Sequence, residues 1–378
     1  MRLLYVTDAI TIWGGLERIL VEKMNFLADE YGYEVFLLTS NQGEHPVPYS
    51  LSPKVVSSDL AIFTFLEYRY KGLKRFYIKY RLSRYFQNKL KSQIEQINPD
   101  IIICPRLELL GLLAKVKGAI PLVFESHSLF RSYQSENGGM YAKIKSHYYI
   151  HHINKVNAIV ALSEGDARDW RTVHKNVFFI PNMAHLNRSG QFSDCMSNRA
   201  IFVGRFSIQK DIGSLIDIWS LVNKRHSDWE LHLYCGYGEL QDDMKQIIME
   251  SDINIILHEP TADIFDAYMS CSMLLLTSMY EPFGLVLPES MSCGLPVIAF
   301  DCPYGPADII TDEVDGFLVR DRDISVFVDK ICQLIEDASL RIKMGQAAIS
   351  SSQRYDAQLI MPLWKQLFEE MKHNPQYN

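Results

Sequence analysis

The sequence predicts an α/β protein made of two Rossmann-like, doubly wound domains, each built around a parallel β-sheet. Its 378 residues exceed the roughly 250–300 at which a single hydrophobic core usually stops growing. In both halves, short apolar and β-branched runs alternate with longer amphipathic segments, which is the pattern of βαβ units. A polar stretch without apolar periodicity, residues 183–198, lies between the halves and predicts an interdomain linker.

The strand candidates are the short apolar runs. In the first half they are Leu3 to Thr7, Glu34 to Thr39, Asp100 to Cys104, Pro121 to Glu125 and Ala158 to Leu162. In the second half they are Ala200 to Val203, Glu230 to Tyr234, Asn254 to Leu257, Ser272 to Thr277, Pro296 to Phe300 and Gly316 to Val319. Near the end, Leu359, Leu363 and Leu367 recur at helical spacing. We therefore expect domains at 1–182 and 199–354, followed by a closing helix and tail, 355–378, that packs back toward the N-terminal domain.

The composition is that of an ordinary folded protein, with 48% hydrophobic and 22% charged residues. The seven cysteines form no C-x-x-C pattern, so neither a disulfide framework nor a structural zinc site is indicated. Asp8 interrupts the N-terminus before a signal-peptide core could form, and no apolar stretch reaches the about 20 residues that span a bilayer. We therefore expect a cytoplasmic protein.

The net charge of -7 is unevenly distributed along the chain. Residues 1–182 contain 23 Lys and Arg against 17 Asp and Glu, whereas the remainder contains 15 against 28. Such a division predicts that the first half faces something anionic, either a membrane or a phosphorylated acceptor.

The strongest motif is E-P-F-G-L-V-L-P-E, residues 281–289, which follows an apolar strand and enters a helix near Leu285. A helix that begins at the carboxyl edge of a parallel sheet presents backbone N–H groups and a partial positive charge, which is where a phosphate binds. Glu281 in the turn and Glu289 inside the helix can accept hydrogen bonds from different hydroxyl groups of one ligand. Spacing alone equally permits a structural role, in which Glu281 caps the helix electrostatically and Glu289 is solvated.

The second motif is G-R-F-S-I-Q-K, which begins at Gly204 near the end of an apolar strand. Its cations, Arg205 and Lys210, can neutralise a leaving nucleoside diphosphate without the help of a metal. The structural alternative is a pair of surface charges at a loop and a helix start.

These motifs resemble the E-x7-E motif and the G-R-x-x-x-x-K segment of the family 4 retaining glycosyltransferases of the GT-B fold. The resemblance follows the same order along nearly the whole chain. It implies that Glu281 contacts the donor sugar and Glu289 the ribose. It also implies that the amides of Gly284, Leu285 and Val286, together with the two cations of the second motif, bind the diphosphate.

The same resemblance implies roles for three further residues. The loop that contains Gly15 resembles the family's G-G-x-E-R loop, which lies over the cleft between the domains. His127 follows a predicted strand, where many family members place a His that contacts the donor sugar or helps to organise the acceptor. Gly236 begins a G-Y-G-E turn that resembles the family's G-x-G-E turn beside the nucleotide.

Two other patterns bear on metal use and on the donor. Residues 321–323 spell D-R-D, like the metal-binding D-x-D of other glycosyltransferases, but Asp323 precedes an amphipathic segment and is better explained as a helix N-cap. We therefore expect no metal and no cofactor. The run C-P-Y-G-P-A-D-I-I, residues 302–310, resembles a loop of family members that often use UDP-galactose, UDP-GalNAc or related sugars, which favours a UDP-linked donor.

Residues 68–91 contain nine Lys and Arg interleaved with aromatic residues and no Asp or Glu. This composition is typical of a helix on an anionic membrane surface, although an internal helix with a solvated basic face would share it. The family's lipid-linked acceptors favour the membrane, so we expect a peripheral protein on the inner face of the plasma membrane. Nucleic-acid binding is disfavoured because the chain is acidic and lacks a recognised module.

The sequence therefore predicts a retaining, metal-independent glycosyltransferase. We expect it to move a hexose or N-acetylhexosamine, of galactose, GalNAc or glucose type, from a UDP-sugar to a glycan or lipid-linked acceptor held by the N-terminal domain. The alternatives are a nucleotide-sugar epimerase or phosphorylase of the same fold, or a nucleotide-binding module without catalysis. A nicotinamide oxidoreductase is disfavoured because no G-x-G-x-x-G follows the first strand.

Overall fold

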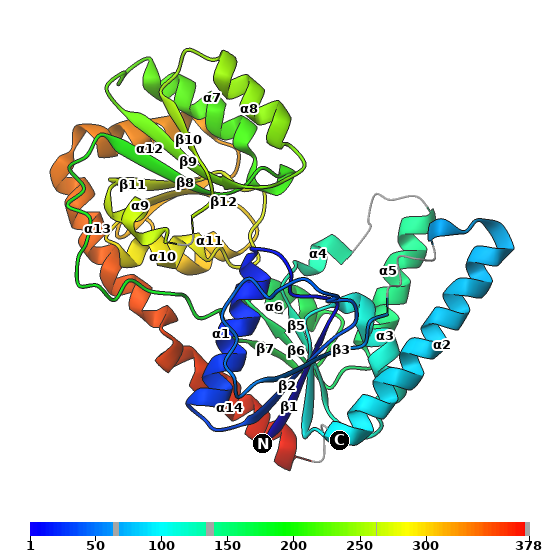
Figure 1. The fold of residues 1–378 in the computed structure, drawn as a ribbon. Helices are drawn as coiled ribbons and strands as arrows, with labels where there is room; N and C mark the ends of the chain where they lie inside the picture. The colour runs from blue at the N-terminus through cyan, green and yellow to red at the C-terminus, as the bar shows by residue number, and fades with distance from the viewer. Residues whose placement is uncertain (63–67, 134–139, 262, 375–378) are drawn as a thin grey trace. The chain divides into compact units, whose positions relative to one another are not determined.

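A computed structural model describes residues 1–62, 68–133, 140–261 and 263–374. The chain divides into two compact units (Figure 1). Unit 1 contains Met1–Leu162, Asp166–Ile180 and Met361–Asn378, and unit 2 contains Ser163–Gly165 and Pro181–Ile360. Each unit is an α/β structure with its own parallel sheet, which confirms the predicted fold class.

Unit 1 contains a sheet of seven strands in the order β3-β2-β1-β4-β5-β6-β7, with every neighbouring pair parallel. The strands are β1 (Arg2–Thr7), β2 (Glu34–Thr39), β3 (Val56–Asp59), β4 (Ile101–Cys104), β5 (Leu122–Ser126), β6 (Ala158–Ala161) and β7 (Val177–Phe179). The helices are α1 (Gly15–Asp29), α2 (Gly72–Ile97), α3 (Leu107–Val116), α4 (Phe130–Tyr133), α5 (Met140–Ile153), α6 (Glu164–Arg171) and α14 (Ala357–His373).

Unit 2 contains a sheet of six strands in the order β10-β9-β8-β11-β12-β13, again parallel throughout. The strands are β8 (Arg199–Arg205), β9 (Glu230–Gly236), β10 (Ile255–His258), β11 (Met273–Leu276), β12 (Val297–Asp301) and β13 (Gly316–Arg320). The helices are α7 (Ile212–Asn223), α8 (Gln241–Glu250), α9 (Phe265–Met269), α10 (Val286–Ser292), α11 (Gly305–Ile309), α12 (Ile324–Glu336) and α13 (Ala338–Ser352). Short 3-10 turns occur at Ile208–Lys210 and Gln353–Tyr355.

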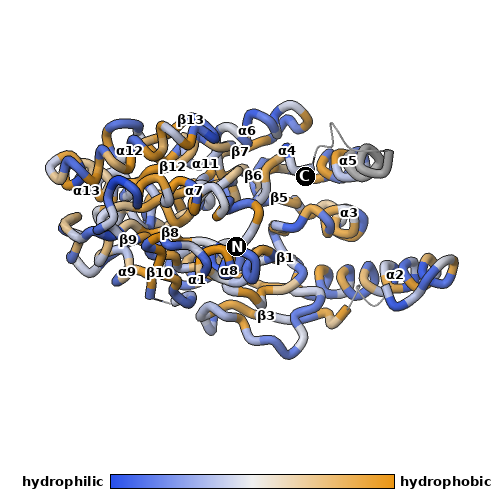
Figure 2. Tube along the Cα trace, turned by 90° about the horizontal axis from the view of Figure 1, so that it is seen from above, coloured by the Kyte–Doolittle hydropathy of each residue, from blue (hydrophilic) through white to orange (hydrophobic). Residues whose placement is uncertain are grey.

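The central strands are buried on both faces, which is why they are continuous apolar runs rather than alternating ones. All residues of β4, β6 and β11 are buried, and Figure 2 shows hydrophobic strand segments such as β8 and β12. The eleven predicted strands are present within one or two residues of their expected bounds. The sequence did not predict β3, because V-S-S-D is polar and exposed, or β7, which has three residues.

Most of the closing helix belongs to unit 1, whereas the predicted linker belongs to unit 2. From Met361 onward α14 is part of unit 1, as expected for the closing helix, and it buries Trp364, Leu367, Phe368 and Met371. Residues 183–198 form no helix or strand, but their contacts place them in unit 2, where Leu186 and Cys195 are buried.

Helix α2 has two different halves. Phe86, Leu90 and Ile94, four residues apart, are its buried residues and anchor its C-terminal half in the core of unit 1. No residue before Phe86 is buried, and Leu73 and Phe76 are 89% and 73% exposed. The N-terminal half therefore projects beyond the sheet of unit 1 (Figure 1).

Candidate functional site

The two predicted nucleotide motifs meet at the switch point of the unit 2 sheet, where the strand order reverses between β8 and β11. In doubly wound sheets, ligands bind beyond the carboxyl ends of the strands at this point. Arg205 ends β8, Lys210 follows in the 3-10 turn, and Glu281 lies in the loop after β11. The structure therefore brings together residues that lie far apart in the sequence.

Lys210 and Glu281 form a largely buried ion pair. The Lys210 ammonium donates a hydrogen bond of 2.5 Å to Glu281 Oε1, which also accepts one of 2.7 Å from Ser278 Oγ. The two side chains are 13% and 6% exposed. Burial of a charge is tolerated when it is paired and hydrogen-bonded, as here, so the pair presents a fixed cation and a fixed carboxylate at the switch point.

Further hydrogen bonds join the loops that carry this pair. Met279 N donates to Gln209 O at 2.8 Å, and Gln209 Nε2 donates to Tyr280 O at 3.0 Å. Thr277 Oγ1 donates to the Lys210 carbonyl at 3.1 Å. Because the contacts run in both directions, the two loops hold each other in place.

The E-P-F-G turn is held against the loop that follows β12. Glu281 N donates to Pro303 O at 2.8 Å, and Gly305 N donates to Glu281 O at 2.8 Å. Gly284 adopts φ +95°, a conformation that favours glycine, just before α10 begins. The predicted turn and helix start are thus present, and the peptide groups of residues 284–286 lie at the N-terminal end of α10.

Glu289 lies inside the first turn of α10 and is 3% exposed, so the solvated role is excluded for it. Its backbone N–H donates to Leu285 O at 3.2 Å as part of that turn. Glu281 is also buried and takes part in hydrogen bonds, so neither carboxylate is an ordinary surface charge.

The predicted glycines of unit 2 lie beside the cations. Gly204 is the second-last residue of β8 and Gly236 is the last residue of β9, where it pairs with Arg205. A Cβ at Gly204 would lie 3.0 Å from the Phe202 ring and 3.4 Å from Lys210 Cγ. A side chain at Gly204 would therefore press mainly on the Phe202 ring, next to the lysine.

In unit 1, the predicted residues lie at the same edge of the sheet. Gly15 begins α1 after the loop that follows β1, and His127 directly follows β5. Asp8 and Arg106 were not expected as site residues; they follow β1 and β4. Arg106 Nε donates a 2.8 Å hydrogen bond to Asp8 Oδ1 across the switch point of this sheet. A pairing between loops so distant in the sequence leaves no local signal.

Arg322 is a third site residue that the sequence did not indicate. Asp323 caps α12 as predicted, accepting a hydrogen bond of 3.1 Å from Val326 N. Arg322, in the middle of the same D-R-D, has φ +62° and pairs with Asp211. It also donates to the carbonyls of Thr277 and Ser278 at 3.0 and 2.8 Å. One guanidinium thus connects the loop of Lys210 with the loop of Glu281.

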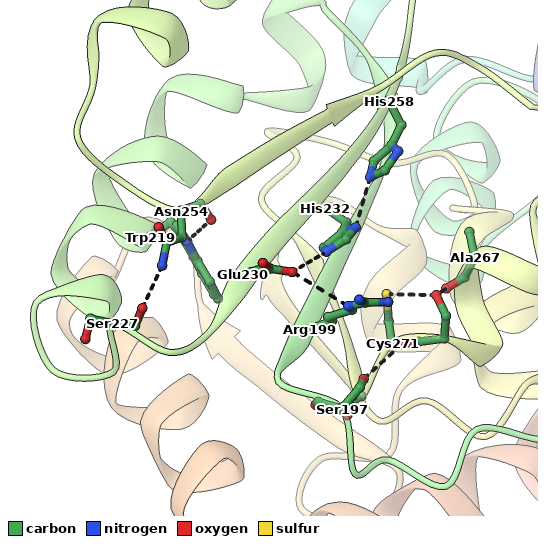
Figure 3. A network of polar contacts seen from close by, with 12 residues as sticks. Ser197, Arg199, Trp219, Ser227, Glu230, His232, Asn254, His258, Ala267 and Cys271 are labelled. Carbon is green, nitrogen blue, oxygen red and sulfur yellow. Dashed lines mark hydrogen bonds and ion pairs between the residues drawn. The ribbon is translucent and has the colours of Figure 1, made fainter.

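A separate polar network lies on β8, β9 and β10 of unit 2 (Figure 3). His232 Nδ1 lies 2.9 Å from His258 Nε2, and His232 Nε2 lies 3.1 Å from Glu230 Oε2. Arg199 Nε lies 3.6 Å from the same carboxylate, and the His258 ring stacks on Tyr234 with centroids 4.3 Å apart. The Glu230 carboxylate only accepts hydrogen bonds, so Nε2 of His232 carries a proton. In the neutral ring Nδ1 of His232 is then the acceptor, and His258 Nε2–H donates to it.

Because of the His232–His258 pair, we expect the protein to lose stability in mild acid. Burial lowers the pKa of His258 below its ordinary value of 6.5, and the charges of His232 and Arg199 lower it further. The unfolded chain therefore takes up the proton more readily, so this contribution to stability is present above the ordinary pKa and is lost as the pH falls. Between about pH 7.5 and pH 5.5, the melting temperature should fall more for the wild type than for His258→Gln. Equal pH dependence in the two proteins would contradict this prediction.

All seven cysteines are buried free thiols, and burial raises the pKa of Cys235 to about 12. Among the described residues, no three His, Cys, Asp or Glu side chains are grouped so that they could hold a metal ion. Over the same part of the chain, no helix combines the length and the apolar character needed to cross a bilayer.

Comparison with known proteins gives matches over most of the chain. Residues 13–188 match the family described as Glycosyltransferase Family 4, and residues 187–351 match the family described as Glycosyl transferases group 1. The amylovoran biosynthesis glycosyltransferase AmsD of Erwinia amylovora is 29% identical over 380 residues, which cover 97% of this chain and 99% of the relative. An uncharacterized glycosyltransferase of Haemophilus influenzae is 25% identical, with 93% and 95% of the two chains covered.

Solved structures show the same fold at lower identity. A mutant of S. aureus TarM in complex with UDP and other ligands has a TM-score of 0.77 at 17% identity, covering 97% of this chain and 99% of that one. HepE of Anabaena in complex with UDP has a TM-score of 0.73 at 17% identity, covering 98% and 100%. The two parallel sheets, the motifs at the switch point and the matches over residues 13–351 together show that the chain belongs to the family 4 glycosyltransferases of the GT-B fold.

Proposed function

We propose that the chain transfers a hexose or N-acetylhexosamine from a UDP-sugar to a glycan or lipid-linked acceptor, with retention and without a metal. The observation that carries this proposal is the buried Lys210–Glu281 pair at the switch point of unit 2. The names of the relatives agree with it, since AmsD is assigned to amylovoran biosynthesis and both TarM and HepE were crystallised with UDP. Among donor sugars, galactose, GalNAc and related types are favoured, because the C-P-Y-G-P loop resembles that of family members which often use them.

The leaving group determines what unit 2 must supply. When the bond between the anomeric carbon and the phosphate oxygen breaks, negative charge develops on the UDP. Lys210 has three N–H donors, and the hydrogen bond to Glu281 uses one of them. The remaining donors, the Arg205 guanidinium and the amides of Gly284, Leu285 and Val286 would stabilise the departing diphosphate.

The other site residues would hold the sugars. Glu281, fixed by Lys210 and Ser278, would orient the donor sugar, while Glu289 would accept hydrogen bonds from the ribose hydroxyls. His127 would be the contribution of unit 1. In the retaining reaction, a phosphate oxygen of the donor would take the proton of the incoming hydroxyl, so that no protein general base is required.

The direct test is a donor screen with purified protein. UDP-galactose, UDP-GalNAc, UDP-GlcNAc and UDP-glucose would be incubated with a glycan or polyprenyl-linked acceptor in the presence of a chelator, and UDP release and product configuration would be measured. We expect acceptor-dependent UDP release with the α or β configuration of the donor retained. A requirement for an added divalent ion would contradict metal independence, and an inverted product would contradict retention.

The same assay separates the alternatives. A new UDP-sugar formed without acceptor and without UDP release would identify an epimerase. Nucleotide binding without turnover for any donor would identify a binding module. Melting temperatures measured with each UDP-sugar would first show which donors bind. A ligand at 100 times its dissociation constant adds about 2.7 kcal/mol to the free energy of unfolding.

Arg322 is expected to act by positioning the two loops. Arg322→Gly keeps the positive φ without strain but removes the contacts with Asp211, Thr277 and Ser278. Without these contacts the loops of Lys210 and Glu281 can shift relative to each other, which should lower kcat/KM about 10- to 100-fold. The exposed Arg320→Ala, two residues away, is the control and should keep normal rates. Wild-type kcat/KM in Arg322→Gly would contradict this role.

We further propose that the N-terminal half of α2 binds an anionic membrane surface. Residues 68–91 carry nine basic residues and no acidic one, and Leu73, Phe76, Tyr77 and Tyr80 are exposed among them. Each cation near an anionic leaflet contributes about 1 kcal/mol, and aromatic rings favour the headgroup region. The buried C-terminal half of α2 would hold this surface in a fixed orientation to unit 1.

Vesicle sedimentation tests this surface. Neutralising Arg75, Lys79, Arg81 and Arg84 together should abolish sedimentation with vesicles of anionic phospholipid, with no change for zwitterionic vesicles. Exchanging Lys and Arg at the same four positions keeps the charge and should keep binding. If the neutralised variant binds anionic vesicles as the wild type does, the basic face of α2 is merely solvated.

A further inference from the structure

Lys23, Glu125 and His127 form a buried cluster near the carboxyl edge of the unit 1 sheet. The proposed reaction does not explain why Lys23 and Glu125 are there. Glu125, in β5, is fully buried, and its Oε1 accepts a hydrogen bond from Lys23 Nζ of α1. The Nε2 of His127 lies 2.9 Å from the same oxygen. The side chains of Lys23, Glu125 and His127 are 3%, 0% and 8% exposed.

The C-terminal helix completes the surroundings of this cluster. The Lys23 ammonium lies 3.8 Å from the ring centroid of Trp364, in α14, and 6.0 Å from that of Tyr5, in β1. Trp364 and Tyr5 are themselves buried, so water is excluded from the lysine. A cation over a desolvated aromatic face is favourable, and together with the carboxylate it compensates for the lost hydration.

A buried ion pair is weak evidence for a role in stability. Replacing a buried ion pair by apolar residues is often neutral or stabilising, so charges kept in the core call for another explanation. Burial by itself raises the pKa of Glu125, but Lys23 and His127 more than offset it and lower the pKa to about 2. Burial lowers the pKa of Lys23, and Glu125 partly offsets this. Glu125 is therefore ionised at neutral pH, and its Oε1 lies 2.9 Å from His127 Nε2.

The Glu125 carboxylate beside Nε2 determines which nitrogen of the His127 ring carries the proton. A carboxylate only accepts hydrogen bonds, so the nitrogen that faces it must carry a proton. In the neutral ring the other nitrogen, Nδ1, is then the acceptor, and a partner on one nitrogen fixes both the tautomer and the orientation of the ring. The arrangement is that of a base held by an orienting carboxylate.

We propose that Glu125 is a positioning residue that holds His127 as the Nε2–H tautomer, so that Nδ1 accepts a hydrogen bond from a hydroxyl group of a sugar, and that Lys23 and Trp364 keep Glu125 in place. Only the sugar ligand in this statement rests on the proposed function. Because Trp364 belongs to α14, the docking of the C-terminal helix on unit 1 supports the orientation of His127.

The first test uses no substrate. In protein labelled with ¹⁵N-histidine, the His127 signals are assigned by their loss in His127→Gln. We expect a slowly exchanging proton on Nε2 of His127 in the wild type, and its loss in the double variant Lys23→Met, Glu125→Leu. The double variant removes both charges together, so neither is left buried alone and the fold should persist. A proton found on Nδ1, or an unchanged Nε2 proton in the double variant, would overturn the proposal.

The second test asks whether Glu125 acts through His127. With a donor and acceptor identified by the screen, the double variant and His127→Ala should each lower kcat, and the triple variant should lose no more than His127→Ala alone. If the triple variant instead lost activity by the product of the two separate effects, Lys23 and Glu125 would act independently of His127, through the stability of unit 1. Leu363→Ala, at a partly exposed position of the same helix as Trp364, is the control and should leave kcat unchanged. If no donor is turned over, the proposed function fails while the NMR result still stands.

Discussion

Replacing Lys210 by alanine is expected to abolish most sugar transfer, with kcat lower by about 10²–10³-fold, the usual effect of removing one group that stabilises developing negative charge. The structure adds a second consequence. Without Lys210, the buried Glu281 carboxylate loses its cation and keeps the hydrogen bond from Ser278. Leaving this charge buried without its ion-pair partner should lower the free energy of unfolding by about 3–5 kcal/mol. Steady-state kinetics and urea unfolding would measure the two effects.

A double variant separates these effects. Lys210→Met with Glu281→Gln removes both charges, so it should recover much of the stability while remaining inactive. Arg225→Ala breaks an exposed ion pair with Asp329 in the same unit and should change neither quantity appreciably. Wild-type turnover in Lys210→Ala would refute the assignment of this lysine to the leaving diphosphate.

Gly305→Ala is expected to have the next largest effect, although Gly305 carries no functional group. A Cβ at this position would lie 1.9 Å from Phe283 O and 2.7 Å from Phe283 Cα, both of which are backbone atoms. The added methyl group can be accommodated only if the E-P-F-G turn moves. Since a displacement of about 1 Å can reduce rates on the order of 10²-fold, kcat/KM should fall by that order, and UDP affinity should fall with it.

Gly213→Ala is the matched control for this substitution. In α7 the nearest atom to an added Cβ is Asp211 Oδ1, at 3.8 Å. Because alanine favours a helix more than glycine does, Gly213→Ala should raise stability by about 0.5–1 kcal/mol and leave activity unchanged. Isothermal titration with UDP would compare the two variants, and normal UDP affinity in Gly305→Ala would contradict the prediction.

The sequence predicted those features whose cause is local. Buried parallel strands are apolar throughout, and the turn at Gly284 has its own residue preferences, so the two sheets and the start of α10 could be expected from short segments. The exposed edge strand β3 lacks this pattern and was missed. The roles of Glu281, Glu289, Arg205 and the other site residues stay predictions that the variants above would test.

The features that could not be predicted depend on pairs of residues distant in the sequence. Glu281 and Lys210 were both assigned to the ligand from their motifs, and only the fold shows that they also bind each other. Lys23 resembles any other helix lysine until β5 places Glu125 beside it. Arg322 was set aside with its D-x-D, because nothing in those three residues indicates Asp211 or the carbonyls after β11.

The return of α14 to unit 1 has a consequence for the growing polypeptide. The apolar face of unit 1 that receives Trp364, Leu367, Phe368 and Met371 is built from residues translated early, whereas these four side chains come after residues 181–360. Unit 2 needs no residue beyond Ile360. Unit 1 must wait for the last turns of the final helix, so this unit, although first to be translated, is the last to be completed.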